Sequence, residues 1–221
     1  MKHSNHPSSE SLPIALIIFF IAGYQNAYTY VVRGNVFANL QTGNMILVSF
    51  HIAHGDFTIV GRYLIPLLFF CIGCAIASYI RLKNVNLARK YWHWQCNALL
   101  IQLIIFTLVG FIDQQYNIVA NALITMNAAF ILVTFDKFKG ITLPSTMMIG
   151  NLKNSVQDIV AYALDHDKTH IHHFCVVFGL LNTFILGCLV ESYIAQICHD
   201  ASIWGALPLT LLAILIIEKY K

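Results

Sequence analysis

The chain has 221 residues, of which 58% are hydrophobic and 10% are charged, and its formal net charge is +3. Soluble domains carry about 25% charged residues, so this composition excludes an ordinary soluble domain and indicates a polytopic membrane protein. No arginine-rich patch is interleaved with aromatic residues, so we expect no nucleic-acid partner. As a membrane protein, the chain is expected to have the lipid bilayer as a partner.

Apolar stretches follow one another along the chain. Residues 1–11 form a polar N-terminal tail, and the apolar run after it has no obvious cleavage site, so we expect a retained first span. Six stretches are predicted to be membrane-spanning helices, which makes the fold class all-α. They cover residues 12–32, 63–80, 96–112, 118–135, 174–195 and 203–217.

Two further segments, about 35–54 and about 141–165, are interrupted by polar residues. The first contains Gly43-Asn44 and the second contains Gly150-Asn151. We predict that both segments are broken or re-entrant helices, because a plain membrane helix does not carry such an interruption. The backbone groups freed at a break must be satisfied by protein, water or ligand.

Matched residues recur in the two halves of the chain, with separations that rise steadily. This pattern predicts a duplication, with a first repeat at 12–112 and a second at 113–221. Each repeat holds three spans, an odd number, so the repeats are predicted to be inverted relative to each other. The matched pairs are Asn26 with Asn127, Gly34 with Gly140, Gly43 with Gly150, and Gly73 with Gly187.

The positions of the basic residues predict the topology. If the interrupted segments do not cross the membrane, eleven of the thirteen lysines and arginines share one side, and only Arg33 and Arg62 lie on the other. Basic residues concentrate in cytoplasmic loops. Both termini are therefore predicted to be cytoplasmic, and the six-span model is preferred to one with eight crossings.

Four blocks of sequence carry a family resemblance: residues 22–27 (AGYQNA), residues 37–44 (FANLQTGN), His54-Gly55-Asp56 and residues 149–152 (IGNL). At these blocks the chain resembles the YoaK family of bacterial membrane proteins, which is defined by domain of unknown function 1275. The resemblance covers nearly the whole chain, and the Thr-Gly-Asn block is its most specific part. It implies a multi-pass protein of the bacterial inner (cytoplasmic) membrane and supplies no substrate or activity.

An inverted repeat with one discontinuous helix in each half is the plan of many secondary transporters, whose sites form where the breaks meet. We therefore predict a secondary transporter or permease for an unidentified small solute. The alternative is a structural or regulatory membrane protein acting through partners, in which the Gly-Asn pairs only let helices pack closely. The candidate substrate-binding residues are Gln25, Asn26, Thr42, Gly43, Asn44, Asn127, Gly150 and Asn151.

Glu191 is the only acid well inside a predicted span, and such a carboxylate is a candidate for coupling. Its position near the end of the span also allows it to reach the interface. His166 and His170, four residues apart, are weak candidates for binding a metal, and a solvated loop is the preferred interpretation. Cys71 and Cys74 have the spacing of a redox pair, but helix packing is preferred.

No catalytic triad, paired carboxylates, phosphate-binding loop or dinucleotide fingerprint occurs in the sequence, so we predict no enzyme and no cofactor. Six short spans leave little protein to enclose a cavity, which favours a homodimer. Gly73, Ala77 and Gly187 would provide small faces for close helix approach, within or between subunits.

Overall fold

A computed structural model describes residues 11–84, 94–138, 141–142, 145 and 148–219. Within these residues the fold is helical, apart from one antiparallel pair of two-residue strands in which Lys137 faces Thr142. The helical fold class expected from the sequence is therefore confirmed. Most of the predicted tail 1–11, together with Gly140, lies outside the described residues.

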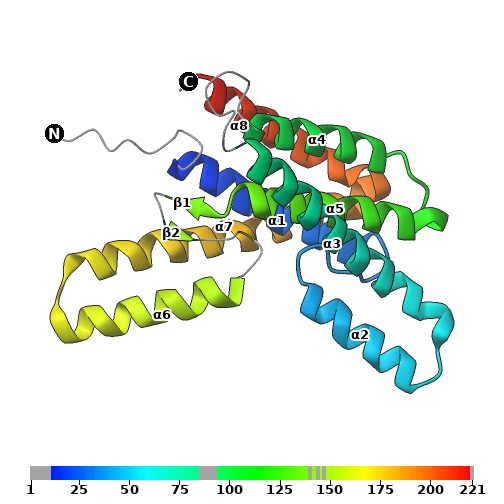
Figure 1. Ribbon diagram of the computed structural model, residues 1–221, viewed down its shortest axis with the longest axis horizontal. Helices are drawn as coiled ribbons and strands as arrows, with labels where there is room; N and C mark the ends of the chain where they lie inside the picture. Colours follow the sequence, from blue (N-terminus) through cyan, green and yellow to red (C-terminus); the bar gives the residue numbers. More distant parts are fainter. Residues whose placement is uncertain (1–10, 85–93, 139–140, 143–144, 146–147, 220–221) are drawn as a thin grey trace.

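The helices and strands follow the predicted stretches in order (Figure 1). They are α1 (Leu12–Val31), α2 (Gln41–Ala53), α3 (Phe57–Asn84), α4 (Trp94–Val109), the 3-10 helix η2 (Gln114–Tyr116), α5 (Asn117–Thr134), β1 (Lys137–Phe138), β2 (Ile141–Thr142), α6 (Met148–Asp165), α7 (Lys168–Cys198), the 3-10 helix η3 (His199–Ala206) and α8 (Leu207–Lys219).

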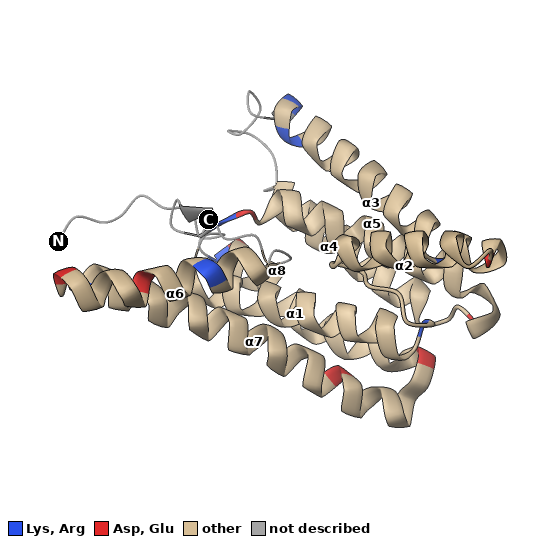
Figure 2. Cartoon of the chain, turned by 90° about the horizontal axis from the view of Figure 1, so that it is seen from below, with Lys and Arg blue, Asp and Glu red and all other residues tan. Residues whose placement is uncertain are grey.

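Four stretches of the described chain are long and apolar enough to cross a bilayer: Leu12–Val31, Phe57–Lys83, Gln114–Thr134 and Lys168–Lys219. The helix Trp94–Val109 is also apolar but shorter. Lysine, arginine, aspartate and glutamate are absent from the middles of α1, α3, α4 and α5 (Figure 2). Helices of this kind indicate a protein embedded in a membrane.

The last of these stretches consists of two helices. His199 follows α7 with φ 46° and ψ −121°, a conformation that ends the helix. α7 packs along α1, and η3 and α8 then return beside α1 and α4. The predicted spans 174–195 and 203–217 therefore correspond to α7 and to η3 with α8.

Helices from the two halves of the sequence pack against each other. α1 lies along α7, and α5 lies along α3, while α2 packs on α3 and α6 packs on α7 (Figure 1). A glycine lies at each of two of these contacts, α1 with α7 and α3 with α5, and its lack of a side chain lets the two helices approach closely. A Cβ atom on Gly187 would lie 2.1 Å from the carbonyl oxygen of Phe20, and one on Gly73 would lie 2.5 Å from that of Met126. The small residues expected from the sequence thus bring helices together within this chain.

Two clusters of buried apolar side chains divide the interior along its length. The first includes Ile14, Ile18, Leu99, Phe130, Ile131 and Ile214. The second includes Ile21, Tyr28, Phe106, Ala120, Ile124 and Ile203. α1 meets the first cluster near its start and the second near its end, whereas α5 does the reverse. The two helices therefore run in opposite directions.

The first interrupted segment differs in detail from the broken helix expected at 35–54. The chain leaves α1 through Gly34 (φ 85°) and Asn35 (φ 61°) and runs without helix to residue 40. Glycine adopts this left-handed conformation without strain. Gly43 lies inside α2, so the break precedes the Gly-Asn pair instead of coinciding with it.

Candidate functional site

The two Gly-Asn pairs occupy equivalent places in two short helices. Gly43 and Asn44 are the third and fourth residues of α2, and Gly150 and Asn151 are the third and fourth residues of α6. Both asparagines are buried. Each helix begins toward the middle of the molecule and runs outward, α2 to one side and α6 to the other (Figure 1). Both helices therefore direct their N-terminal ends toward the interior.

The non-helical segment before α2 is held by side chains. Three consecutive backbone N–H groups donate to them: Phe37 to Asn44 Oδ1 (3.1 Å), Ala38 to Thr29 Oγ1 (3.1 Å), and Asn39 to the side-chain oxygen of Asn26 (3.0 Å). An unpaired backbone group away from water costs several kilocalories per mole, so these bonds permit a non-helical chain in an apolar setting. Asn26 and Asn44 therefore stabilise the backbone of this segment, a structural role different from the close helix packing that the sequence offered as the alternative for the Gly-Asn pairs.

A buried amide network connects this segment to α1 and α5. Gln25 Nε2 donates to Asn39 Oδ1 at 3.0 Å, and Asn39 Nδ2 donates to the carbonyl oxygen of Ala22 at 2.7 Å. Asn127 Nδ2 approaches Gln25 Oε1 at 3.4 Å. The predicted residues Gln25, Asn26 and Asn127 are thus brought together, and Asn39, which the prediction omitted, bonds to both Gln25 and Asn26.

The remaining predicted residues have different surroundings. Thr42 is exposed, and Gly43 lies under the ring of Phe37, where a Cβ atom added to the glycine would lie 3.0 Å from ring carbon Cδ2. A Cβ atom on Gly150 would meet nothing within 4 Å among the described residues. Asn151 is buried in the first turn of α6, and the hydroxyl of Ser155 one turn later is buried without a partner in the described part of the chain.

Further buried polar groups lie in the interior, near the boundary between the two apolar clusters. Gln102 lies on the buried side of α4, between Leu99 of the first apolar cluster and Ile105 of the second. Neither of its amide atoms has a hydrogen-bond partner among the described residues, and the hydroxyl of Thr125 on α5 has none either. Asn127 Oδ1 is also buried and has no hydrogen-bond partner among the described residues. Buried polar groups are normally paired, so these groups are available to water or to a ligand.

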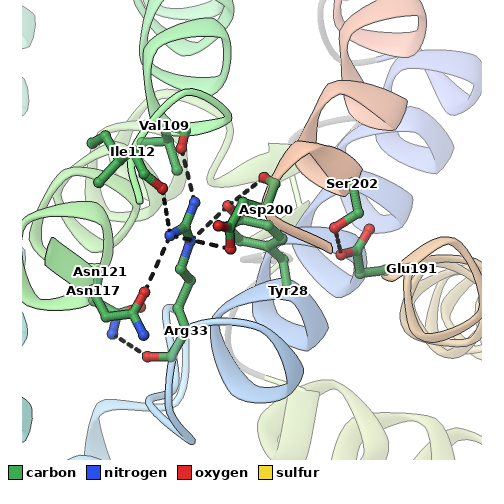
Figure 3. Close-up of polar contacts among 9 residues, drawn as sticks. All are labelled: Tyr28, Arg33, Val109, Ile112, Asn117, Asn121, Glu191, Asp200 and Ser202. Carbon is green, nitrogen blue, oxygen red and sulfur yellow. Dashed lines mark hydrogen bonds and ion pairs between the residues drawn. The ribbon is translucent and has the colours of Figure 1, made fainter. Parts of the chain in front are cut away.

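Arg33 is fully buried where α1, α4, α5 and η3 meet (Figure 3). Its guanidinium donates to the carbonyl oxygens of Val109 (2.9 Å) and Ile112 (2.7 Å) and to Tyr28 Oη (2.8 Å). Nη1 also lies 3.4 Å from Asp200 Oδ1. Arg33 thus satisfies carbonyl groups at the end of α4. Sequence reasoning missed it, since an arginine at the end of a span looks like an interface residue.

Glu191 is fully buried on α7. Its Oε1 accepts a hydrogen bond of 2.6 Å from Ser202 Oγ of η3, as Figure 3 shows, and Oε2 has no hydrogen-bond partner among the described residues. The hydroxyl of Tyr24 donates to the carbonyl oxygen of Ser202 at 2.6 Å. A carboxyl group in this position connects α7 to η3 through one of its two oxygens.

The histidines near the turn between α6 and α7 pair with aspartates. His170 Nε2 lies 3.2 Å from Asp165 Oδ2, its Nδ1 lies 3.7 Å from Asp158 Oδ1, and His173 contacts Asp158. His166 packs edge-on against a tyrosine ring. No group of three or more histidine, cysteine or acidic residues in the described part of the chain has the arrangement of a metal site. Cys71 and Cys74 are both free thiols on α3.

Comparison with known proteins gives one match. A family model described as "Protein of unknown function (DUF1275)" matches residues 14–217. No curated protein and no solved structure matches the chain. The match covers both Gly-Asn pairs and the whole amide network, so it agrees with the resemblance found in the sequence.

Proposed function

Because the chain belongs to the DUF1275 family, whose function is unknown, we propose a function from the geometry of the chain itself. The protein is a secondary transporter or permease for a small polar solute, which binds between the N-terminal ends of α2 and α6. The observation that carries this proposal is the equivalence of the two short helices, each with a buried Gly-Asn asparagine in its first turn.

Three features support an inverted repeat of three spans in each half. The Gly-Asn pairs occupy equivalent helical positions, and Gly73 and Gly187 each lie at a close helix crossing. The contact of α1 with α7 has a counterpart in the contact of α5 with α3, and α1 and α5 run in opposite directions. With α4 and α8 counted beside α1, α3, α5 and α7, six helices cross the membrane.

The chemistry of the helix ends favours a class of solute. The N-terminus of a helix carries a partial positive charge and unpaired N–H groups, so it attracts anionic groups and hydrogen-bond acceptors. The groups of Gln102, Thr125 and Asn127 that have no partner among the described residues add neutral donors and acceptors. We therefore propose a small solute that is neutral or singly anionic.

We propose Glu191 as the coupling residue. It is a buried carboxyl group with one oxygen unpaired within the described chain, so it can exchange a proton, and intramembrane acids commonly have such a role. We also propose that the protein lies in the bacterial inner membrane, as the family resemblance implies, and that both termini are cytoplasmic, as the distribution of basic residues predicts. A homodimer remains our proposal for its assembly, and we propose no catalytic activity.

The direct test is flux in proteoliposomes against a panel of neutral and anionic metabolites, with and without a pH gradient. Asn151→Leu should abolish flux while the protein still inserts and folds, because one hydrogen bond inside a membrane protein contributes only about 0.6–2 kcal/mol. Asn182→Leu is the matched control, because Asn182 is an exposed asparagine on α7 whose amide donates to the Phe178 carbonyl oxygen one turn earlier. A flux that Asn151→Leu leaves unchanged would remove α6 from the proposed site.

A second candidate function has support from one observation. Both polar atoms of the Asn44 side chain bond to the backbone of Phe37, which leaves the amide with little capacity for a ligand. This favours a structural or regulatory membrane protein in which the asparagines stabilise the fold. Under this alternative, no solute on the panel is carried, and Asn44→Leu and Asn151→Leu both lower the melting temperature.

A further inference from the structure

Two arginine–aspartate pairs join the ends of the long helices. In the first, Arg33 after α1 lies 3.4 Å from Asp200 after α7. In the second, Nη1 of Arg81 in the last turn of α3 lies 2.8 Å from Asp136 Oδ2 after α5. Each arginine also donates to the carbonyl oxygens that end a neighbouring helix, and Arg81 does so to Val133 at 3.0 Å.

The two pairs occupy equivalent places in the proposed repeat, with the charges exchanged. In the contact between α1 and α7, the arginine follows α1, and the aspartate follows α7, the counterpart of α3. In the contact between α5 and α3, the aspartate follows α5, the counterpart of α1, and the arginine ends α3. A duplication alone would leave the same charge at matching positions of the two repeats. The charges are instead exchanged, so the two contacts share an arginine–aspartate pair but not the residue at each position.

The pairs lie at opposite ends of one helix. Arg33 Nη1 donates to the side chain of Asn117, the first residue of α5, at 3.1 Å. Arg81 contacts Val133 and Asp136 at the other end of α5. A helix of 18 residues is about 27 Å long, close to the thickness of about 30 Å of the hydrocarbon core of a bilayer. One pair therefore lies near each face of the membrane.

The aspartate is the separable partner in each pair. The side chains of Asp200 and Asp136 are 28% and 29% exposed, so each aspartate borders solvent, although Asp200 Oδ1, which faces the buried Arg33, is itself buried. Arg33 can keep its carbonyl partners Val109 and Ile112 when Asp200 moves away, because both belong to its own half of the chain. The Val133 carbonyl oxygen that Arg81 contacts lies on α5, beside Asp136, and separates from Arg81 together with that aspartate. Partly exposed ion pairs are weak, which applies to Arg81–Asp136, with side chains 35% and 29% exposed. The Arg33–Asp200 pair is long, at 3.4 Å, and Arg33 stays hydrogen-bonded to Val109 and Ile112 when the pair opens.

We propose that these pairs are the two gates of the transporter, with Arg33–Asp200 closing one face of the membrane and Arg81–Asp136 closing the other. This proposal rests on the proposed function, since a gate needs a site to enclose. Under the proposed topology, the first pair controls access from outside and the second controls access from the cytoplasm. Each gate joins one helix from each repeat, so opening one moves the two halves apart at that face only.

The test uses the full-length protein with its six native cysteines replaced and Gly150→Cys as a reporter, because a Cβ atom at that position meets no described neighbour within 4 Å. A membrane-impermeant maleimide is added to right-side-out and to inside-out vesicles, and the rate of labelling is measured. Asp200→Asn and Asp136→Asn are compared with Asp200→Glu and Asp136→Glu. Asp113→Asn and Glu218→Gln are controls, since both residues are exposed acids near opposite ends of the helices.

Asp200→Asn should increase labelling severalfold from the outer face only, and Asp136→Asn should do so from the inner face only. The glutamate variants and both controls should label at the unmodified rate. The proposal is overturned if both asparagine variants affect the same face, if neither changes labelling, or if either fails to fold, because the pair is then a structural contact. Labelling needs no solute, so a failed flux assay would count against the proposed function and leave this result standing.

Discussion

Asn44 and Phe37 are joined through both polar atoms of the asparagine side chain, with Oδ1 accepting from the Phe37 N–H at 3.1 Å and Nδ2 donating to the Phe37 carbonyl oxygen at 2.7 Å. The residue with the strongest sequence signal for a binding role thus completes the backbone hydrogen bonding of the segment before its own helix. Asn44 Nδ2 also donates to Gln41 at 3.0 Å. The position of the N-terminus of α2 depends on this side chain.

Asn44→Leu should therefore destabilise the protein, because it leaves the N–H and the carbonyl group of Phe37 without partners. A hydrogen bond inside a membrane protein contributes about 0.6–2 kcal/mol, and two to the backbone are lost. Thermal unfolding in detergent measures the change. Thr42→Ala, two residues earlier and exposed, should unfold at the temperature of the unmodified protein. Equal melting temperatures for the two variants would contradict the structural role of Asn44.

Gly187→Ala should separate α1 from α7. The added Cβ would lie 2.1 Å from the carbonyl oxygen of Phe20, and overpacking of this kind costs about 1–3 kcal/mol. Gly179→Ala is the matched control on the same helix, since its Cβ meets nothing within 4 Å in the described part of the chain. That change should stabilise the helix by about 0.5–1 kcal/mol. Unfolding in a denaturing detergent compares the two, and shifts of the same sign would refute the close contact.

Arg33→Lys should be poorly tolerated although it retains the charge. A single ammonium group cannot reach Val109, Ile112, Tyr28 and Asn117 together, as the planar guanidinium does. At least one hydrogen bond to a charged donor is lost, at about 1.5–3 kcal/mol each. Arg62→Lys, at an exposed position, should have no effect on melting. A stable Arg33→Lys variant would show that the carbonyl contacts matter little.

Glu191→Gln should fold normally and lose coupling. The amide oxygen of glutamine still accepts from Ser202 Oγ, so the free energy of unfolding should change by no more than about 1 kcal/mol. Because glutamine cannot release a proton, a pH gradient should no longer accelerate flux. Flux measured at several gradients checks this, with Glu218→Gln as a control on an exposed acid. Unaltered dependence on the gradient would exclude Glu191 as the coupling group.

The topology is tested by single cysteines placed at Asp56 and at Lys83. Under the proposed orientation, Asp56→Cys reacts with an impermeant reagent from outside, and Lys83→Cys reacts only after the inner face is opened. Both sites lie at helix ends, at the turn between α2 and α3 and in the last turn of α3. Reaction of Lys83→Cys from outside would rule out the inverted arrangement with cytoplasmic termini.

The sequence predicts the long apolar helices well. The expected span 12–32 corresponds to α1, Leu12–Val31, and the expected span 118–135 corresponds to α5, Asn117–Thr134. Hydropathy marks only the apolar part of a helix, however, so the expected span 174–195 begins after the start of α7. That start is set by Asp167, whose carboxylate accepts from the Thr169 N–H at 2.9 Å. This bond lowers the pKa of Asp167 below its usual range.

The candidate site is harder to predict, because it depends on contacts between distant segments. Gln25, Asn26 and Asn127 are identifiable as polar residues in apolar runs, and they do lie together. Asn39 precedes the helix and gives no such signal, although it bonds to both Gln25 and Asn26. Arg33 resembles an interface residue in the sequence, since its partners on α4 and η3 lie more than 70 residues away along the chain.

The contact of α1 with α7 has a consequence for biosynthesis. α1 leaves the ribosome first, and the helix against which Gly23 packs is completed only near the end of the chain. The side chain of Gln25 likewise lacks its contact with Asn127 until α5 has been made. Until α5 and α7 are inserted, polar amides of α1 lack the partners they have in the folded protein, which is costly in lipid. Because the contacts of α1 with α7 and of α3 with α5 join the two halves, we expect the halves expressed as separate chains to assemble through these complementary surfaces.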